Sequence, residues 1–218
     1  MKTSTRSLIN RNYPFELLPL QYLENAFLEN FLTPEIFSYH RNKHHQGYIN
    51  KLNGLLSLEE NEYLRKMKLE RLIEYSRANK KTAIFNNAAQ TWNHDFFWLC
   101  ISPDSQEKHK RNLWKLILQQ YESWEKFVKT FVEASVNHFA SGWSWLVISN
   151  GQLKIVTTSN AELPLSEENS VFPIFTCDLW EHAYYLAFKN DRSKYVETTL
   201  NKFLNWENLE SNYEAALS

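Results

Sequence analysis

Residues 173–185 read PIFTCDLWEHAYY, and they decide the fold because a short strand, predicted at 174–177, gives way here to helices that continue toward the C-terminus. The stretch holds one thiol, two carboxylates, one imidazole and four aromatic rings. Three interpretations are open. Cys177 is a nucleophile with His182 as its base, Asp178 and His182 hold a metal, or the polar groups form a seam in a core. Each interpretation requires different partners elsewhere in the chain.

The segment before this stretch predicts a β-hairpin. Residues 143–159, WSWLVISNGQLKIVTTS, form two β-prone runs on either side of Asn150-Gly151, a strong short-range hairpin signal. Two helical stretches, 106–120 and 123–139, precede it. Together with the strand that follows, these elements predict a C-terminal domain of helices around a small three-stranded antiparallel sheet.

The first half of the chain is predicted to be helical throughout. Thr33, Pro34 and Glu35 provide the capping hydroxyl, the first-turn proline and the first-turn acid of a helix start, and Asn53-Gly54 provides a stop. We expect this helix to pair with a second one, over 58–79, as an antiparallel hairpin.

The fold class is therefore predicted as α+β, with a soft boundary after a third helical segment, residues 83–101. Ser102-Pro103 ends that segment, because the residue before a proline disfavours the helical conformation. We assign residues 1–12 to an N-terminal tail, 13–103 to an N-terminal helical hairpin domain, and 104–218 to the C-terminal domain.

Composition excludes several partners. The 218 residues carry 24 Lys and Arg against 25 Asp and Glu, interspersed along the chain, so the basic surface that nucleic acid requires is not expected. No apolar run approaches the roughly 20 residues that cross a membrane, and residues 1–12 lack the apolar stretch of a secretory signal. Two cysteines are too few for a disulfide framework and favour a reducing compartment. We expect a soluble, cytoplasmic protein, with organellar import through the first twelve residues left open.

Histidines in two other segments provide partners for a metal. His40, His44 and Tyr48 are successively four residues apart on the first predicted helix, so they lie along one face. Gln90 and His94 have the same spacing in the third helical segment. The alternative for each of these residues is a hydrogen-bonded, half-buried polar group without a metal.

The metal interpretation of Asp178 and His182 is favoured over the other two. A carboxylate among aromatic rings requires positive charge, and no Lys or Arg lies between Lys154 and Lys189. Three imidazoles and one carboxylate form a ligand set that suits iron, manganese or zinc. The nucleophile interpretation is disfavoured because Asp178, next to Cys177, opposes formation of a thiolate.

Five motifs together resemble the iron and manganese superoxide dismutase family. They lie in the family's order and at similar intervals, and the resemblance runs from about Tyr13 to Leu217. The motifs are YHRNKHHQGYINKLN, FNNAAQTWNHDFFW, FASGWSWLV, TSNAELPL and DLWEHAYYL. The resemblance implies an enzyme that converts superoxide to dioxygen and hydrogen peroxide by one-electron cycling of a single metal.

The resemblance also implies a role for each candidate residue. Spacing alone does not separate His40 from His44 or His45, and the family pattern selects His40 as the ligand. The implied residues are, for the metal, His40, His94, Asp178 and His182; for catalysis, Tyr48, His44 and Gln90; for the cavity lining, Trp92, Trp143 and Trp180; for a homodimer interface, Glu181 and Tyr185; and for substrate guidance, Arg192. Lys43 is a second candidate for guidance because it lies beside the histidines.

Iron is the metal that the resemblance favours, at one ion per subunit. Iron enzymes of the family generally carry a glutamine where this chain has Gln90, whereas many manganese enzymes have glycine there and supply a glutamine where this chain has Ala161. A manganese-dependent or cambialistic enzyme is the alternative. Two further classes are a catalytically silent binding protein on the same fold, which the intact ligands argue against, and a non-redox metallohydrolase, for which the aromatic lining leaves little room.

Overall fold

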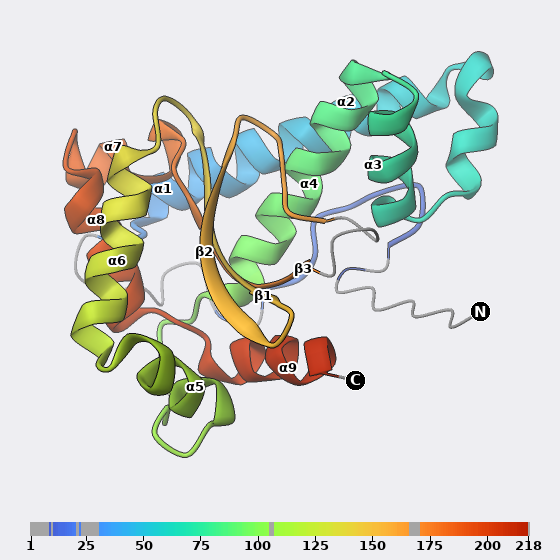
Figure 1. Ribbon diagram of the computed structural model, residues 1–218. Helices are drawn as coiled ribbons and strands as arrows, with labels where there is room; N and C mark the ends of the chain where they lie inside the picture. The colour runs from blue at the N-terminus through green and yellow to red at the C-terminus, as the bar shows by residue number, and fades with distance from the viewer. Residues whose placement is uncertain are drawn as a thin grey trace.

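The structure, a computed structural model, describes residues 9, 11–20, 22, 31–104, 107–165 and 171–217. Figure 1 shows how its elements are arranged. In chain order they are α1 (Pro34–Tyr39), the π-helix η1 (His40–His45), α2 (Gln46–Ser57), the 3₁₀ helix η2 (Glu59–Lys66), α3 (Leu69–Ala78), α4 (Thr82–Cys100), α5 (Asn112–Tyr121), α6 (Trp124–Asn137), β1 (Gly142–Ser149), β2 (Gln152–Ser159), β3 (Val171–Asp178), α7 (Glu181–Phe188), α8 (Arg192–Lys202) and α9 (Trp206–Leu217).

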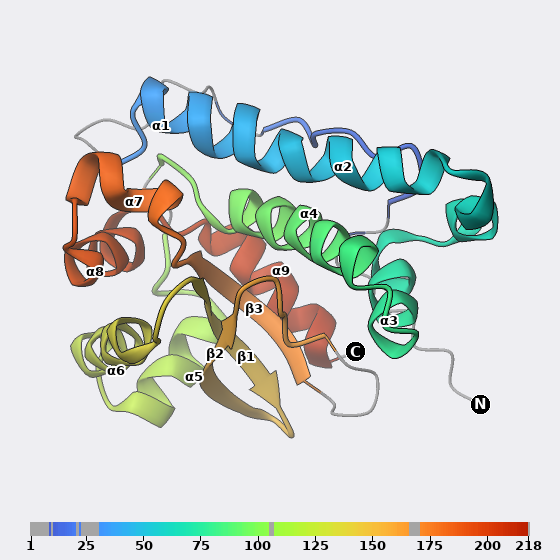
Figure 2. The same cartoon turned by 90° about the horizontal axis from the view of Figure 1, so that it is seen from above.

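One long helix dominates the first half. α1, η1 and α2 follow one another without a break, and this helix runs antiparallel to α4 (Figure 2). The Thr33 hydroxyl caps it by accepting a hydrogen bond from the Ile36 N–H at 3.3 Å, and Pro34 occupies the first turn. The predicted helix start is confirmed.

Two predicted details of this half are wrong. The long helix passes through Asn53-Gly54 and ends at Ser57, because the Asn53 side chain exchanges two hydrogen bonds with the backbone of Phe15 instead of ending the helix. The segment predicted as one helix over 58–79 is divided into η2 and α3. The antiparallel partner of the long helix is α4, and α3 packs on α4 as well.

The predicted N-terminal tail is partly described. Residues 1–8 and 10 lie outside the described residues. Ile9 is only 3% exposed, and its N–H donates to Glu70 Oε1 at 3.1 Å. The Arg11 carbonyl oxygen accepts from the Leu69 N–H at 3.0 Å. Both positions therefore pack on the hairpin, and the exact domain limits stay predictions.

The sheet is antiparallel throughout, with the strand order β2-β1-β3. Ser149 pairs with Gln152 across a two-residue turn. Asn150 and Gly151 have φ angles of 51° and 75° in this turn, the left-handed conformation that a tight hairpin requires. The predicted Asn-Gly hairpin is confirmed.

β3 extends beyond the predicted 174–177 at both ends. Its pairing with β1 shifts by one residue between Leu146 and Val147. This bulge accommodates Pro173, which has no N–H to donate to the ladder. The strand ends at Asp178, whose side chain is fully buried.

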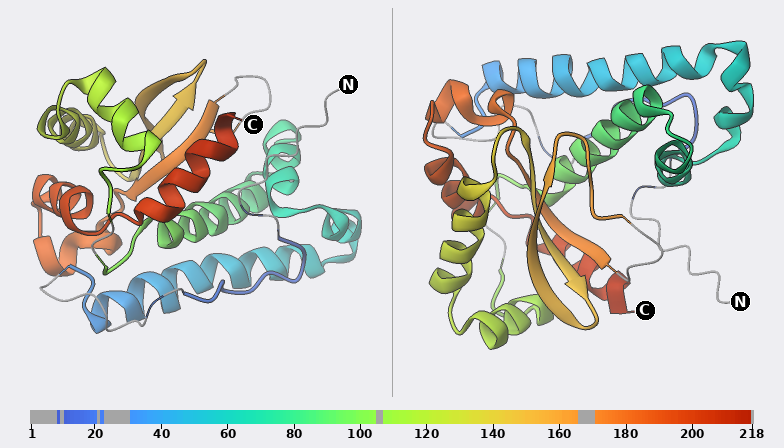
Figure 3. Two further views of the ribbon diagram at one scale, coloured as in Figure 1. Left: turned by 90° about the horizontal axis from the view of Figure 1, so that it is seen from below. Right: turned by 45° about the horizontal axis from the view of Figure 1, so that its top comes forward.

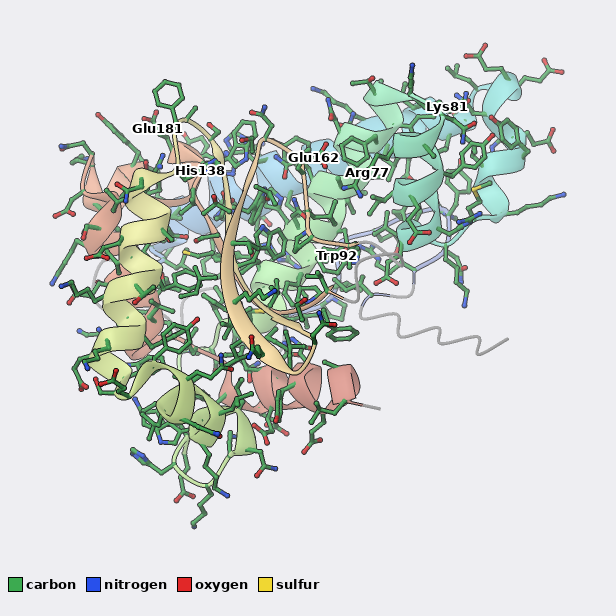
Figure 4. The ribbon with its side chains drawn as sticks, in the orientation of Figure 1. Arg77, Lys81, Trp92, His138, Glu162 and Glu181 are labelled. Carbon is green, nitrogen blue, oxygen red and sulfur yellow. The ribbon has the colours of Figure 1, made fainter. Side chains whose placement is uncertain are left out.

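Helices surround the sheet and connect it to the first half. α4 and α9 lie along β3, whereas α5 and α6 pack near β1 and β2 (Figures 2 and 3). Arg77 of α3 and Glu162 of the loop after β2 face each other (Figure 4), and their ion pair of 2.9 Å joins the two halves. This arrangement confirms the α+β prediction of a helical hairpin followed by helices around a three-stranded sheet. Among the described residues, no helix is both long and apolar enough to cross a membrane.

Candidate metal centre

Four residues from four elements meet between the helical hairpin and the sheet. His40 begins η1, His94 lies in α4, Asp178 ends β3, and His182 is the second residue of α7. Each offers one ligand atom, and these atoms all lie within 4.8 Å of one another. The side chains of His40, His94 and Asp178 are fully buried, and that of His182 is 10% exposed. The structure therefore brings together the four residues that the resemblance implied as ligands.

Three imidazole nitrogens approach the same carboxylate oxygen. The distance from Asp178 Oδ2 to Nε2 is 3.0 Å for His40, 3.3 Å for His182 and 3.6 Å for His94. His94 Nδ1 lies 2.7 Å from the carbonyl oxygen of Gln90, which can only accept, so Nδ1 carries the hydrogen. In the neutral ring, Nε2 then directs a lone pair toward the carboxylate.

The His40 and His94 imidazoles are neutral and the Asp178 carboxylate is charged near pH 7. Burial lowers the pKa of His40 to about 4 and lowers the pKa of His94 well below its ordinary value. Burial alone raises the pKa of Asp178, but the neighbouring His182 and His40 outweigh it, so this pKa lies below the usual range. The His94 lone pair and the negative oxygen therefore face each other without a proton between them, whereas His40 Nε2 lies within hydrogen-bonding distance of Asp178 Oδ2.

A cation satisfies this arrangement. Among the described residues, His94 Nε2 and His182 Nε2 are buried without a hydrogen-bond partner. Imidazole and carboxylate donors in this number suit iron, manganese or zinc. The residues present therefore fit a single transition-metal ion.

A π-helical turn separates the roles of three histidines. Hydrogen bonds in η1 reach one residue further than in an α-helix, which turns successive side chains to different directions. His40 joins the cluster. His44 stacks on His182 with ring centroids 4.1 Å apart, and His45 stacks on His94 at 5.1 Å. Sequence spacing did not show which of these three histidines is the ligand, and only the fold distinguishes them.

Aromatic rings wall the cluster. Trp143 meets His94 edge-on with centroids 5.0 Å apart, and Trp180 stacks on His182 at 5.7 Å. Trp92 lies one layer further out, where its indole N–H donates to a glutamate of α3 at 3.0 Å. A role for Trp92 in the cavity lining stays a prediction.

Two rings of this wall were not among the residues predicted to line the cavity. Phe97 stacks on His40 with centroids 5.4 Å apart, and Trp98 lies at 4.8 Å from the same ring. The two residues follow His94 by three and four positions on α4, so they share its face of the helix. That spacing is the signal that could have identified them.

Tyr48 and Gln90 both contact His94 of the cluster, Tyr48 through its ring and Gln90 through its backbone carbonyl oxygen. The Tyr48 ring is tilted over His94 at 5.4 Å. Burial, followed by the charge of Asp178, raises the pKa of Tyr48 to about 12, so the hydroxyl keeps its proton at neutral pH. Gln90 is 1% exposed, and neither atom of its side-chain amide has a hydrogen-bond partner in the described part of the chain. A buried amide of this kind is placed to bond a small molecule beside the cluster.

The remaining predicted residues lie at the surface. Glu181 is exposed at the start of α7, near the same end of the molecule as His138 (Figure 4), and Tyr185 is 47% exposed on that helix. The Arg192 guanidinium donates to the carbonyl oxygen of His138 at 2.7 Å and to three further carbonyls. Lys43 is exposed. Guidance of an anion by Arg192 or Lys43 stays a prediction.

Fold and site define a class: a protein built to bind one metal ion through three imidazoles and one carboxylate, between a helical hairpin and an α+β half. Comparison with known protein families identifies the class further. The alpha-hairpin domain of the iron/manganese superoxide dismutases matches residues 14–102, and the C-terminal domain of the same family matches residues 108–212.

Individual relatives agree with these matches. A protein named superoxide dismutase [Mn/Fe] from Rickettsia bellii (strain RML369-C) is 43% identical over 201 residues, which cover 92% of this chain and 94% of the relative. A superoxide dismutase [Fe] from Coxiella burnetii (strain RSA 493 / Nine Mile phase I) is 43% identical over 202 residues, which cover 92% and 99% of the two chains. The protein belongs to the iron/manganese superoxide dismutase family, as the resemblance predicted.

Proposed function

We propose that this protein is a superoxide dismutase that works with one iron ion per subunit. The observation that carries the proposal is the convergence of His94, His182 and His40 on the buried Asp178 carboxylate, with the unpaired Gln90 amide beside them. Membership of the family and the names of the relatives support it. A small, ring-walled site also suits a two-atom substrate better than the larger substrate of a hydrolase.

The ligand set is matched to redox chemistry. Three neutral imidazoles and one carboxylate contribute a total charge of −1, so a divalent or a trivalent ion remains positive in this site and attracts an anion. A bound iron or manganese ion supplies one-electron transfer, taking an electron from one superoxide and returning it to a second, which zinc cannot do. The buried rings around the site keep its polar interactions strong by excluding water.

Proton delivery is the second requirement, because two superoxide ions take up two protons when one leaves as dioxygen and the other as hydrogen peroxide. The Tyr48 hydroxyl holds its proton at neutral pH and lies beside His94. His44 is exposed and stacks on His182, so it connects the cluster to solvent. We assign these two residues to proton supply and Gln90 to orienting the solvent or substrate in the cavity.

Gln90 and Ala161 favour iron over manganese. The Gln90 amide comes from α4, whereas the Ala161 methyl group offers no hydrogen bond from the loop after β2. Ala161 is 5% exposed, and its carbonyl oxygen accepts from Asn93 Nδ2 at 3.2 Å, so that loop packs on α4 at the residue next to His94. The glutamine beside the cluster therefore comes from α4, at the position that iron enzymes of the family generally use.

Use of either metal is the alternative. The relative from Rickettsia bellii carries the name superoxide dismutase [Mn/Fe], and at 43% identity it is as similar to this chain as the iron-named relative from Coxiella burnetii. A cambialistic enzyme would retain activity with each metal, and the metal-substitution experiment below distinguishes it from an iron enzyme.

We also propose that the protein works as a homodimer. Large apolar side chains are exposed on α1, α7 and the end of α6, which lie together at one end of the molecule (Figure 3). They are Tyr39, Val136, Phe139, Tyr185 and Leu186, and Phe139 is 93% exposed. Large apolar residues exposed together at one end of a globular protein favour a protein interface. Glu181 and Tyr185 lie in this region, where a partner subunit would cover them.

The cytoplasm is the proposed location. Cys100 and Cys177 are both buried and free. Thiols persist in reducing compartments, whereas secreted proteins commonly carry disulfides. Fractionation with a cytoplasmic marker is the measurement that checks this.

Metal analysis combined with a superoxide assay tests the function. The protein is produced with iron and manganese both supplied, and then reconstituted with each metal alone. We expect close to one equivalent of metal per chain and activity in the iron form. Absence of both metals and of activity contradicts the enzyme proposal and favours a silent binding protein. Activity with manganese alone contradicts the argument from Gln90 and Ala161.

A further inference from the structure

The N-terminal segment reaches the back of the metal cluster. Residues 11–20 run along the helical hairpin (Figure 2), where Phe15 exchanges hydrogen bonds of 3.0 and 2.8 Å with the Asn53 side chain. At the start of this segment, the Arg11 side chain turns inward and its Nη1 pairs with Asp95 Oδ2 of α4. The arginine side chain is 10% exposed and the aspartate side chain is fully buried. The N-terminal segment thus places the positively charged side chain of Arg11 in the core of the hairpin.

Asp95 in turn faces a stack of two imidazoles. Its Oδ1 lies 3.4 Å from His45 Nε2. The His45 ring stacks on His94 with centroids 5.1 Å apart and planes inclined by 21°. His45 is 1% exposed, and within the described residues its ring nitrogens make no hydrogen bond. Contacts therefore lead from a guanidinium, through a carboxylate and a buried ring, to a member of the metal cluster.

Asp95 depends on Arg11 for its position. A buried carboxylate is strongly unfavourable unless a cation pairs with it, and the Arg11 guanidinium donates to one of the two Asp95 oxygens. Arg41, a second cation near Asp95, directs one guanidinium nitrogen to a backbone carbonyl 2.5 Å away. Without Arg11, the Asp95 carboxylate would reorient within its pocket. Because its Oδ1 lies 3.4 Å from His45 Nε2, this movement would displace the His45 ring.

We propose that Arg11 is a positioning residue for the metal centre: paired with Asp95, it holds the His45 ring against His94 and so slows the release of the metal. The inference rests on the proposed function, because it takes His94 to be a ligand. It assigns a role to a residue that precedes position 14, where the match to the family begins.

The test compares iron release from the full-length protein and its variants. Each protein is loaded with iron, and the loss of iron to an excess of chelator is followed at neutral pH together with the visible absorption of the ferric site. Arg11→Gln should release iron about tenfold faster and should alter the absorption band, as expected when a group behind a metal ligand is lost.

Asn53→Ala is the matched control. It frees the same N-terminal segment at Phe15 but leaves the Arg11–Asp95 pair in place. We expect a lower melting temperature with wild-type iron release and an unchanged band. Equal acceleration of iron release by Asn53→Ala and Arg11→Gln overturns the proposal, because the segment would then act only through stability.

Asp95→Asn completes the comparison. If Arg11 acts through Asp95, adding Arg11→Gln to Asp95→Asn should change iron release no further. If Arg11→Gln does not fold, Arg11→Lys replaces it, since lysine keeps the charge without the guanidinium group, and a smaller acceleration is expected. Release at the wild-type rate from the arginine variant overturns the proposal. Failure of the wild-type protein itself to retain iron or manganese contradicts the proposed function instead.

Discussion

His94 shows how a single residue is prepared for a metal. Its Nδ1 donates to the carbonyl oxygen of Gln90, one helical turn earlier, so the regular geometry of α4 selects the tautomer that leaves Nε2 free for a ligand bond. The side chain of the same Gln90 stays unpaired and buried. Gln90 thus orients the ligand His94 through its backbone carbonyl and keeps its side-chain amide available to a molecule bound beside the cluster.

Replacement of His94 tests the cluster directly. His94→Ala should remove most of the bound metal, because only two imidazoles and one carboxylate remain and a transition-metal site of this kind loses affinity steeply with each ligand. Metal content per chain after gel filtration is the measurement. His109→Ala is the control, since His109 is exposed and its ring contacts Trp114 of α5 instead of a cluster histidine. Normal metal content in His94→Ala would show that the ligand set is wrong.

The buried histidines also make the metal-free protein sensitive to acid. Between a pKa of about 4 for folded His40 and 6.5 for the unfolded chain, the unfolded state binds more protons. The stability present above pH 6.5 should therefore be lost as the pH falls toward 4, by about 3 kcal/mol for His40 alone. Urea unfolding of metal-free protein across this range measures the effect. His40→Gln should flatten the profile, and an equally steep profile in that variant would contradict the assignment.

At the scale of elements, close approach at the start of β1 supports the site. A Cβ atom on Gly142 would lie 2.2 Å from the Thr158 carbonyl oxygen and 2.3 Å from His138 Nε2. The Gly142 carbonyl oxygen also accepts from the Leu179 N–H at 2.9 Å, directly after Asp178. The absence of a side chain at Gly142 therefore allows β1, the loop before it and the end of β3 to meet.

Two glycine substitutions should act in opposite directions. Gly142→Ala should lower the free energy of unfolding by about 2 kcal/mol or more, because strand backbone and a packed ring must both move. Gly54→Ala should raise it by about 0.5 to 1 kcal/mol, since Gly54 lies in α2 with no atom within 4 Å of an added Cβ. Urea unfolding of the two variants is the measurement. Equal stability of Gly142→Ala and wild type would contradict the tight packing described.

At the scale of the whole molecule, the site is divided between the two halves of the chain. His40 and His94 come from the helical hairpin, and Asp178 and His182 come from the C-terminal half. Metal binding should therefore stabilise the contact between the halves as well as each half, by linkage between binding and folding.

The proposed homodimer gives a prediction at this scale. Glu181→Ala should raise the dimer dissociation constant at least about tenfold, or about 1.4 kcal/mol, because a partner-facing carboxylate would be lost from the interface. Sedimentation over a dilution series is the measurement. Glu60→Ala, an exposed change on η2 outside the proposed interface, is the control. An unchanged profile for Glu181→Ala would remove this residue from the interface.

Local patterns made much of the fold predictable. The Thr33 cap, the Asn150-Gly151 turn and the end of α4 before Pro103 each depend on the conformational preferences of a few adjacent residues. The stop expected at Asn53-Gly54 was wrong, because the Asn53 side chain is used by a segment almost forty positions away. Propensity describes neighbours in the chain and does not include such a contact.

The sequence by itself determined which chemistry was available, since histidine spacing, an aspartate among rings and five motifs indicated both the metal site and the family. Tertiary structure decided which histidine does what: the π-turn sends His40 to the cluster, His44 to the rim and His45 behind His94. It also decided that Arg11, on a predicted tail, pairs with Asp95 in the core. The physical reason is that a ligand set and its supporting charges come from distant segments, and only packing brings them within bonding distance.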